Sequence, residues 1–467
     1  MSNISRVRKP SVKHTYFGLA VFESVAMLSC LFLGINFSGT NYTGFFDHLL
    51  CADCITFVLV VTLSMAGMGL YHARQRGEPH EQLARIFISF ALASVAQAVF
   101  FYFIPFLEIA PKAIIISLVL SFFIVCLIRY CFSKLAKTAF IRRRVLVLGA
   151  GEKAQIIEQR LRRANDRRGF NLLGFVPMSQ IETAIPEDKR RNVNMDRLCE
   201  YAQRNHIDEI VIAADQRRGA LPMDELYRCR VGGTYVTDVT TFIEKECGKI
   251  PLNLLNPSWI IYSRGYKTND AVIRAFKRLF DVCISIAMLV ATLPLTLITT
   301  LLIMLESGPR APIFYSQTRV GLNGEPFQIF KFRSMRVDAE SNGAVWARKN
   351  DDRVTVVGAF IRKYRIDELP QLLNVLLGDM SFVGPRPERP EFVEKLTEEI
   401  PYYGDRHMVK PGLTGWAQIC YSYGGSTEDA QEKLQYDLYY IKNFSFLLDT
   451  MILIETMEVV LFGKGAR

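Results

Sequence analysis

The chain has little of what a metal centre or a nucleic-acid-binding protein needs. Its ten cysteines are scattered. The pair Cys51 and Cys54 has no second pair at zinc spacing, so we take it as incidental, with a disulfide on the exported side as the alternative. The six histidines form no metal-ligand spacing either, and no nucleic-acid-binding motif accompanies the net charge of +10. Neither zinc chemistry nor nucleic-acid binding is therefore a leading interpretation.

Apolar residues are abundant and gather in long runs. They make up 50% of the 467 residues, which is typical of a membrane protein. Four runs in the N-terminal third each have about the length that a helix needs to cross a bilayer: 16–37, 52–71, 86–106 and 113–132. The first run has no small-residue cleavage site at its end, which favours an anchor over a removed signal peptide. The sequence predicts a four-helix membrane bundle over residues 1–140.

The charges of the loops predict the orientation of this bundle. Basic residues precede the first run and follow the second and the fourth: Arg6, Arg8, Lys9, Lys13, Arg74, Arg76, Lys134, Lys137, Arg142, Arg143 and Arg144. The segment between the first two runs holds Asp47 and Asp53 and no Lys or Arg. By the positive-inside rule both ends of the bundle lie in the cytoplasm, and the basic clusters favour an anionic lipid surface.

The segment after the bundle has the pattern of an α/β unit. Residues 145–154 read as a buried strand, a tight turn at Gly149 and Gly151, and the start of a helix, and residues 207–213 read as a second strand. No Asp or Glu ends the next plausible strand, 172–178, where a ribose-binding carboxylate would be expected. We therefore predict a Rossmann-like α/β domain over residues 141–262 and favour a role in regulation or dimer contacts over dinucleotide binding.

A fifth apolar run, residues 280–305, contains Pro294 at its centre. Basic residues flank it on both sides, among them Lys277, Arg278 and Arg310, so a full crossing would violate the positive-inside rule. Because a proline breaks the helical hydrogen-bond ladder, the pattern favours a helix-break-helix hairpin that enters and leaves by the cytoplasmic face. The alternative is an ordinary proline-kinked span.

The most informative stretch surrounds Asp367 and Glu368. The leucines at 369, 372, 373 and 376 follow helical spacing and predict an amphipathic helix, which places Asp367 at or near its N-terminus. Free N–H groups and the helix dipole there would keep the carboxylate ionised and available as a nucleophile or metal ligand. For an isolated acidic pair, a helix N-cap is the simpler interpretation.

Basic and proline residues around this pair favour phosphate chemistry. Arg362 and Arg365 precede Asp367, and downstream Pro385 and Pro387 fix the backbone on either side of Arg386. A planar, permanently charged guanidinium held in this way suits phosphate oxygens.

From about Arg274 to the C-terminus, the sequence resembles the bacterial sugar transferases, which are polyprenyl-phosphate glycosyl-1-phosphate transferases of the monotopic type. The motifs that carry the resemblance occur in the family's order: Lys277-Arg278 with Asp281, residues 317–321, residues 331–335, the Asp367 block with residues 378–388, and residues 410–418. The resemblance implies a catalytic domain over residues 263–467 with a re-entrant hairpin at about 280–305. It also implies a multi-pass protein of the bacterial inner membrane with this domain on the cytoplasmic face.

The resemblance implies a two-step displacement. Asp367 would attack the phosphorus nearest the sugar in a UDP-sugar and expel UMP, and undecaprenyl phosphate would then take the phospho-sugar from the carboxylate. Glu368 would hold the Mg²⁺ cofactor, and Arg362 would bind phosphate.

The remaining site residues follow by position. Arg386 with Pro385, Pro387 and Glu388 matches the nucleotide-binding segment, and Lys331 and Arg333 belong to a basic motif. Asp281 could support catalysis, or equally cap a helix or pair with Lys277 or Arg278. We treat Lys410 and Trp416 as scaffold, since glycines on both sides suggest a turn. The apolar residues 444–462 contain three carboxylates and predict an amphipathic helix that packs on the domain or rests on the interface.

The donor sugar is left open, with glucose and galactose ahead of N-acetylated sugars. The architecture looks like exopolysaccharide-initiating members, including those associated with exosortase systems, and a homodimer is implied by resemblance alone. Two alternatives from other classes stay open. One is a hydrolase that cleaves nucleotide sugars, and the other is a membrane-bound scaffold or sensor with an inactive transferase domain.

Overall fold

The computed structural model describes residues 12–38, 52–68, 70–71, 79–104, 109–136, 142–161, 169–179, 182–216, 221–255, 265–266, 270–308, 311–336, 353–421, 424 and 426–462. The chain divides into two compact units, residues 1–247 and 248–467. Several residues used above to predict orientation, including Arg6, Arg74, Arg76, Lys137 and Arg310, lie outside the described residues, as does Cys51.

The first unit begins with apolar helices: α1 (Val12–Phe37), α3 (Ala52–Gly67), α4 (Pro79–Phe103) and α5 (Pro111–Ala136). The four predicted apolar runs are thus helical, and α1, α4 and α5 are long and apolar enough to cross a membrane. The second run is shorter than predicted, because α3 has 16 residues and ends at Gly67. Phe57, Met27 and Val125 lie in the buried core of the bundle, whereas Phe17, Phe87 and Phe123 are exposed on its surface.

A buried ion pair links α1 to α5. Arg129 Nη2 donates to Glu23 Oε2 at 2.9 Å, and Arg129 Nη1 donates to the carbonyl of Leu70 at 2.8 Å. Glu23 and Arg129 lie inside two of the predicted apolar runs, where no role was predicted for either residue. Charged groups inside an apolar bundle are expensive unless paired, so this contact fixes the register of α1 against α5.

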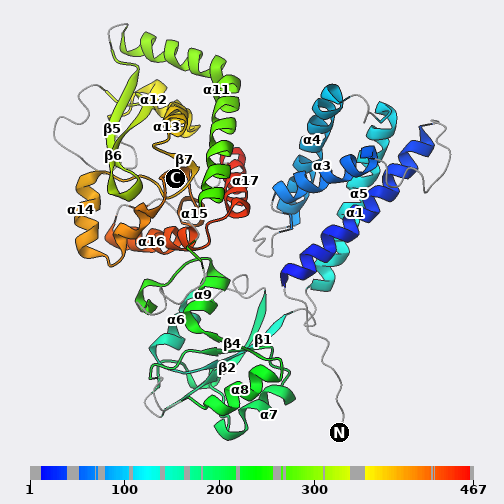
Figure 1. The fold of residues 1–467 in the computed structure, drawn as a ribbon, viewed down its shortest axis with the longest axis vertical. Helices are drawn as coiled ribbons and strands as arrows, with labels where there is room; N and C mark the ends of the chain where they lie inside the picture. The colour runs from blue at the N-terminus through cyan, green and yellow to red at the C-terminus, as the bar shows by residue number, and fades with distance from the viewer. Residues whose placement is uncertain are drawn as a thin grey trace. The chain divides into compact units, whose positions relative to one another are not determined.

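The rest of the first unit is an α/β layer structure. Its elements are β1 (Arg143–Leu148), α6 (Glu152–Arg160), β2 (Phe170–Val176), α7 (Leu198–Arg204), β3 (Glu209–Ile212), α8 (Met223–Val231), β4 (Tyr235–Asp238) and α9 (Val239–Cys247). The strands form one parallel sheet in the order β2-β1-β3-β4. Figure 1 shows α7 and α8 on one side of this sheet and α6 and α9 on the other. The predicted strands, glycine turn and helix are present, and Rossmann-like remains our prediction for the class of this unit.

In the second unit, the 3₁₀ turn η4 (Leu252–Leu254) is followed by the long helix α11 (Ala271–Ser307), which contains Pro294. The side chain of Asp270 caps its N-terminus. Apolar residues such as Val290, Leu297 and Leu305 are exposed in its second half. The helix is one continuous element and not the broken pair predicted, but its ribbon bends partway along (Figure 1). A proline accounts for such a bend because it removes one backbone donor and crowds the preceding turn.

After α11 come two small sheets surrounded by helices. The elements are β5 (Phe314–Val320), β6 (Pro326–Phe332), α12 (Val356–Lys363), the 3₁₀ turn η7 (Ile366–Glu368), α13 (Gln371–Leu377), β7 (Ser381–Val383), α14 (Pro390–Glu399), the 3₁₀ turn η8 (Tyr403–Met408), β8 (Gly412–Thr414), α15 (Trp416–Cys420), α16 (Thr427–Lys442) and α17 (Phe446–Phe462). Strands β5 and β6 pair antiparallel, and β7 and β8 pair parallel. The main core of this unit joins α13, β7, α16 and α17.

Helix α17 packs on this core, which confirms the prediction that residues 444–462 pack on the domain. Leu448 and Ile452 are buried there. Asp449, expected to be costly in an apolar helix, is satisfied by Lys277 Nζ of α11 at 2.5 Å and by the Tyr440 hydroxyl of α16 at 2.7 Å. Lys277 also donates to the carbonyl of Val383 in β7 at 3.2 Å, so this network joins α11, α16 and α17 to β7.

Candidate active site

The acidic pair lies on η7, the single turn between α12 and α13. Arg365 adopts the left-handed conformation, with φ of 58°, and reverses the chain just before the turn. Asp367 is buried, and its Oδ1 atom has no hydrogen-bond partner within the described structure. It is not the N-cap of α13, because Pro370 occupies that position. The expected stabilisation by a helix N-terminus is therefore wrong; burial and then the neighbouring Glu368 raise the pKa of Asp367, and Lys331 opposes them.

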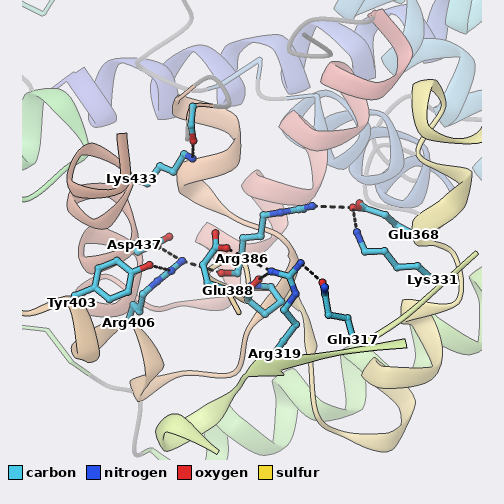
Figure 2. Close-up of polar contacts among 12 residues, drawn as sticks. Gln317, Arg319, Lys331, Glu368, Arg386, Glu388, Tyr403, Arg406, Lys433 and Asp437 are labelled. Atoms are coloured by element: carbon cyan, nitrogen blue, oxygen red, sulfur yellow. Dashed lines mark hydrogen bonds and ion pairs between the residues drawn. The ribbon is translucent and has the colours of Figure 1, made fainter. Parts of the chain in front are cut away.

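Glu368 is held by three cations. Its Oε1 atom lies 3.1 Å from both Lys331 Nζ and Arg386 Nη2, and its Oε2 atom lies 3.8 Å from Arg365 Nη1. Figure 2 shows the side chains of Arg386 and Lys331 pointing toward this carboxylate. Burial disfavours the charge of Glu368, but Lys331 and Arg386 outweigh burial and hold its pKa well below the usual range. Burial in turn lowers the pKa of Lys331.

Arg362 approaches the site from the last turn of α12. Its Nη1 atom is buried and, like Asp367 Oδ1, has no hydrogen-bond partner in the part of the chain that the structure describes. Its positive charge lowers the pKa of Asp367. Two buried polar atoms of opposite charge without partners are unusual in a folded protein and mark a place where a ligand can bind.

The predicted nucleotide-binding segment, Pro385 to Glu388, follows β7 and is held by hydrogen bonds to its backbone. Its prolines cannot donate hydrogen bonds, and all four of its carbonyl oxygens accept one. The donors to residues 385, 386, 387 and 388 in turn are Gly412 N at 2.9 Å, Arg406 Nη2 at 2.9 Å, Arg319 Nη1 at 3.2 Å and Val320 N at 3.0 Å. These hydrogen bonds fix the backbone of the segment, from which the Arg386 side chain reaches Glu368.

Glycines let this segment approach β8 closely. A Cβ atom on Gly384 would lie 2.3 Å from the carbonyl oxygen of Lys410, and one on Gly412 would lie 2.1 Å from the amide nitrogen of Gly384. The glycines around 410–416 therefore serve strand contact and not the predicted turn. Trp416 is scaffold as predicted: it is buried and donates from Nε1 to the carbonyl of Gly248 at 2.7 Å.

Behind the segment lies a buried network that sequence analysis missed. Arg406, from η8, donates to Asp437 Oδ2 of α16 at 2.9 Å and to the Tyr403 hydroxyl at 2.8 Å, besides holding the carbonyl of Arg386. Figure 2 shows Arg406 between Tyr403 and Asp437. Burial raises the pKa of Asp437 to about 6, although Arg406 opposes the shift. No local sequence signal links Arg406 to Asp437, because they lie on different elements.

Asn374 is a second missed residue. It is fully buried although it lies outside the predicted apolar face, whereas Leu373, which belongs to that face, is 44% exposed. Its side chain accepts from Phe330 N at 3.0 Å and donates to the carbonyl of Gln328 at 2.7 Å, so α13 is hydrogen-bonded to β6. This contact sets η7, one turn earlier, against the strand that carries Lys331.

Three predicted residues lie apart from the acidic pair. Arg333 donates from Nε to the carbonyl of Pro312 at 2.8 Å. Asp281 is buried and accepts from the backbone of Phe382 at 3.2 Å; it is not a helix N-cap, since α11 begins at Ala271. Pro294 lies within α11. Their functional roles stay predictions.

The glycine turn of the α/β unit is already filled by carboxylates. Glu182 Oε2 accepts from Ala150 N at 2.9 Å, and Asp215 accepts from Glu152 N at 2.9 Å and Lys153 N at 3.0 Å. These N–H groups, at the turn and at the start of α6, are those that a pyrophosphate would use in a dinucleotide-binding fold. The arrangement supports the expectation that this unit does not bind a dinucleotide.

The comparisons with known proteins agree with this architecture. Residues 272–463 match the model of the family described as bacterial sugar transferase. The chain is 41% identical over 242 residues to the UDP-N-acetylgalactosamine-undecaprenyl-phosphate N-acetylgalactosaminephosphotransferase of Aeromonas hydrophila, covering 52% of this chain and 56% of that protein. It is 33% identical over 349 residues to the undecaprenyl-phosphate glucose phosphotransferase of Komagataeibacter xylinus, covering 73% and 63%. It is 32% identical over 339 residues to the UDP-glucose:undecaprenyl-phosphate glucose-1-phosphate transferase of Xanthomonas campestris pv. campestris, covering 69% and 68%.

Four apolar N-terminal helices and a C-terminal α/β domain with an acidic pair among basic side chains define a membrane-associated transferase. The chain belongs to the bacterial sugar transferase family. The matched region contains the whole site described above, although the matches span less than two thirds of the Aeromonas and Komagataeibacter proteins.

Proposed function

We propose that this protein transfers a sugar 1-phosphate from a UDP-sugar to undecaprenyl phosphate and releases UMP. The observation that carries the proposal is the pair of buried, unpartnered atoms Asp367 Oδ1 and Arg362 Nη1, beside the cationic cluster of Lys331 and Arg386. A carboxylate oxygen free of hydrogen bonds can act as a nucleophile toward phosphorus, and a free guanidinium N–H can bind an oxygen of the phosphate that is attacked.

In the first step, an Asp367 oxygen forms a bond to the sugar-linked phosphorus while the bond from that phosphorus to the bridging oxygen breaks. The electron pair leaves with UMP, and the sugar phosphate remains on Asp367 as an acyl phosphate. In the second step, a phosphate oxygen of undecaprenyl phosphate attacks the same phosphorus. The carboxylate leaves, and the product is a lipid-linked diphosphate sugar.

Charge neutralisation is the main requirement of this chemistry, because an anionic nucleophile must approach an anionic diphosphate. Arg362, Lys331 and Arg386 supply three cationic side chains around the acidic pair. Arg386 and Lys331 also keep Glu368 ionised, which leaves Asp367 as the carboxylate of the pair with the raised pKa. The rigid Pro385–Glu388 segment holds Arg386 without the entropy cost of ordering a loop.

The residues present fit a Mg²⁺ ion. The described residues contain no group of three His, Cys, Asp or Glu side chains that could hold a metal by themselves. Mg²⁺ needs only one or two carboxylates when phosphates and water complete its shell. Glu368 would hold the ion, which would supply further neutralisation of the diphosphate when bound.

The proposed setting is the cytoplasmic face of the inner membrane, with α11 as a re-entrant hairpin and the α/β unit as a Rossmann-like module. The bend in α11 and the exposed apolar residues after Pro294 support the hairpin. A lipid-linked acceptor keeps its phosphate at the membrane surface, so an active site beside a membrane helix suits it. We further propose that the reaction initiates exopolysaccharide synthesis, and that the protein forms a homodimer.

The relatives indicate which donors to try. Their names give UDP-glucose and UDP-N-acetylgalactosamine as donors. The test is UMP release by the purified full chain from UDP-glucose, UDP-galactose, UDP-N-acetylglucosamine and UDP-N-acetylgalactosamine, with and without undecaprenyl phosphate and Mg²⁺. A lipid-linked product from one donor supports the proposal. Free sugar phosphate in its place would indicate a hydrolase, and no release from any donor would overturn the transferase function.

A further inference from the structure

The first turn of α12 is capped by a residue from the far end of α11. Glu306 Oε1 accepts hydrogen bonds from Val356 N at 2.8 Å and from Val357 N at 3.2 Å. The next amide, Gly358 N, donates to the side chain of Thr355 at 2.9 Å. The free N–H groups at the start of a helix need such partners, and a carboxylate there also interacts favourably with the helix dipole. Glu306 therefore holds the N-terminus of α12 on α11.

A small, separate core lies beneath this cap. It consists of the buried side chains of Ile303 from α11, Phe332 from β6, Ile361 from α12 and Ile366 from η7. The distal end of α11 and α12 lie side by side (Figure 1). Ile366 directly precedes Asp367, so the membrane helix packs against the turn that carries the nucleophile.

Helix α12 is also tightly fixed against Ser334, two residues after the end of β6. A Cβ atom on Gly358 would lie 2.0 Å from the carbonyl oxygen of Ser334, and Thr355 N donates to that same oxygen at 3.1 Å. Such close contact leaves α12 little freedom to shift alone. A movement of its N-terminus would be carried along this short helix to Arg362 in its last turn.

We infer that Glu306 is a positioning residue, which couples the distal end of the membrane helix α11 through α12 to Arg362. The kinetic consequences of this inference rest on the proposed function, whereas the structural coupling does not depend on it. Glu306 does not touch the acidic pair; it acts by holding the helix whose other end supplies the phosphate-binding arginine.

The first test is amide hydrogen exchange of the full chain in lipid nanodiscs, independent of any activity. Glu306→Ala is expected to speed exchange in residues 353–360 by about fivefold, the factor that corresponds to a typical helix cap. Exchange in residues 361–368 is expected to rise with it. Glu398→Ala, at an exposed position on α14, is the matched control and should change neither segment. Faster exchange confined to residues 353–360 would overturn the coupling.

The second test is kinetic. Glu306→Ala should lower kcat for UMP release by about fivefold or more, while KM for the UDP-sugar stays within about twofold, because the loss is one of orientation. Glu306→Gln, which keeps an acceptor oxygen but no charge, should fall between wild type and Glu306→Ala. On an Arg362→Ala background, Glu306→Ala should have little further effect, since both changes act on the same group.

The outcomes separate the two claims. Equal losses from Glu306→Ala with and without Arg362, or a kcat equal to that of wild type, would overturn the positioning role. A wild-type protein that releases no UMP from any donor would overturn the proposed function, and the exchange experiment would still decide whether the end of α11 controls residues 361–368.

Discussion

Removing Arg406 should strongly destabilise the second unit. Its side chain is 7% exposed and that of Asp437 is 3% exposed, so the pair is buried. Arg406→Met would leave the carboxylate of Asp437, the hydroxyl of Tyr403 and the carbonyl of Arg386 without this donor. Breaking a buried pair by removing one partner costs about 3–5 kcal/mol. For a unit of this size, such a loss corresponds to a fall in Tm of about 6–20 °C.

Tryptophan fluorescence provides the assay, because all three tryptophans, Trp259, Trp346 and Trp416, belong to the second unit. Thermal unfolding of the full chain, followed by this signal, should show the fall for Arg406→Met and no change for the exposed control Glu398→Gln. A fall of less than about 2 °C would refute the reasoning, since it would mean that the network contributes no more than a surface ion pair.

Asp437→Asn should behave differently from Arg406→Met, and the pKa of Asp437 gives the sign. Because burial raises this pKa to about 6 in the folded state, the folded protein binds the proton more tightly than the unfolded chain. The free energy of unfolding should therefore fall as the pH rises from about 4 to 6. Asp437→Asn should lack this slope. An identical slope in both proteins would contradict the assignment.

Three further predictions concern other parts of the chain. Gly384→Ala should cost more than about 3 kcal/mol in the free energy of unfolding, because its Cβ would meet backbone atoms that cannot move aside; full stability in urea unfolding would refute this. Lys331→Ala should move the acid limb of kcat/KM for UMP release to higher pH, since it removes a charge that lowers the pKa of Asp367, and Glu368→Gln should move it to lower pH; shifts of the same sign would contradict the arrangement. NADH titrated into the wild-type chain should show no change in its fluorescence, because Asp215 occupies the N–H groups that its phosphates would need, and a saturable change would overturn this interpretation.

Much of the fold was predictable because its signals are local. The apolar runs predicted helices, and the Val145–Gly151 pattern predicted a strand and a turn, since each depends on neighbouring residues. The end of α3 and the continuity of α11 through Pro294 were not predicted. A proline bends a long helix without ending it when the following turns still form their own hydrogen bonds.

The site was predicted in part for the same reason. The motif located Asp367 and Glu368, but their environment depends on distant residues: Lys331 lies on a strand 37 positions away from Glu368. Burial of Asp367 reverses the pKa direction that a helix N-terminus would give. Asn374 and Glu306 had no sequence signal, because their partners are backbone groups of other elements.

The most direct measurement is mass spectrometry of the protein after brief exposure to a UDP-sugar with Mg²⁺ and without undecaprenyl phosphate. The account predicts a peptide that contains Asp367 and carries the added mass of one sugar phosphate, with an equal amount of UMP released. The adduct should disappear when undecaprenyl phosphate is added and be absent from Asp367→Asn. UMP release and lipid-linked product that persist in Asp367→Asn, or an adduct on another residue, would contradict Asp367 as the nucleophile.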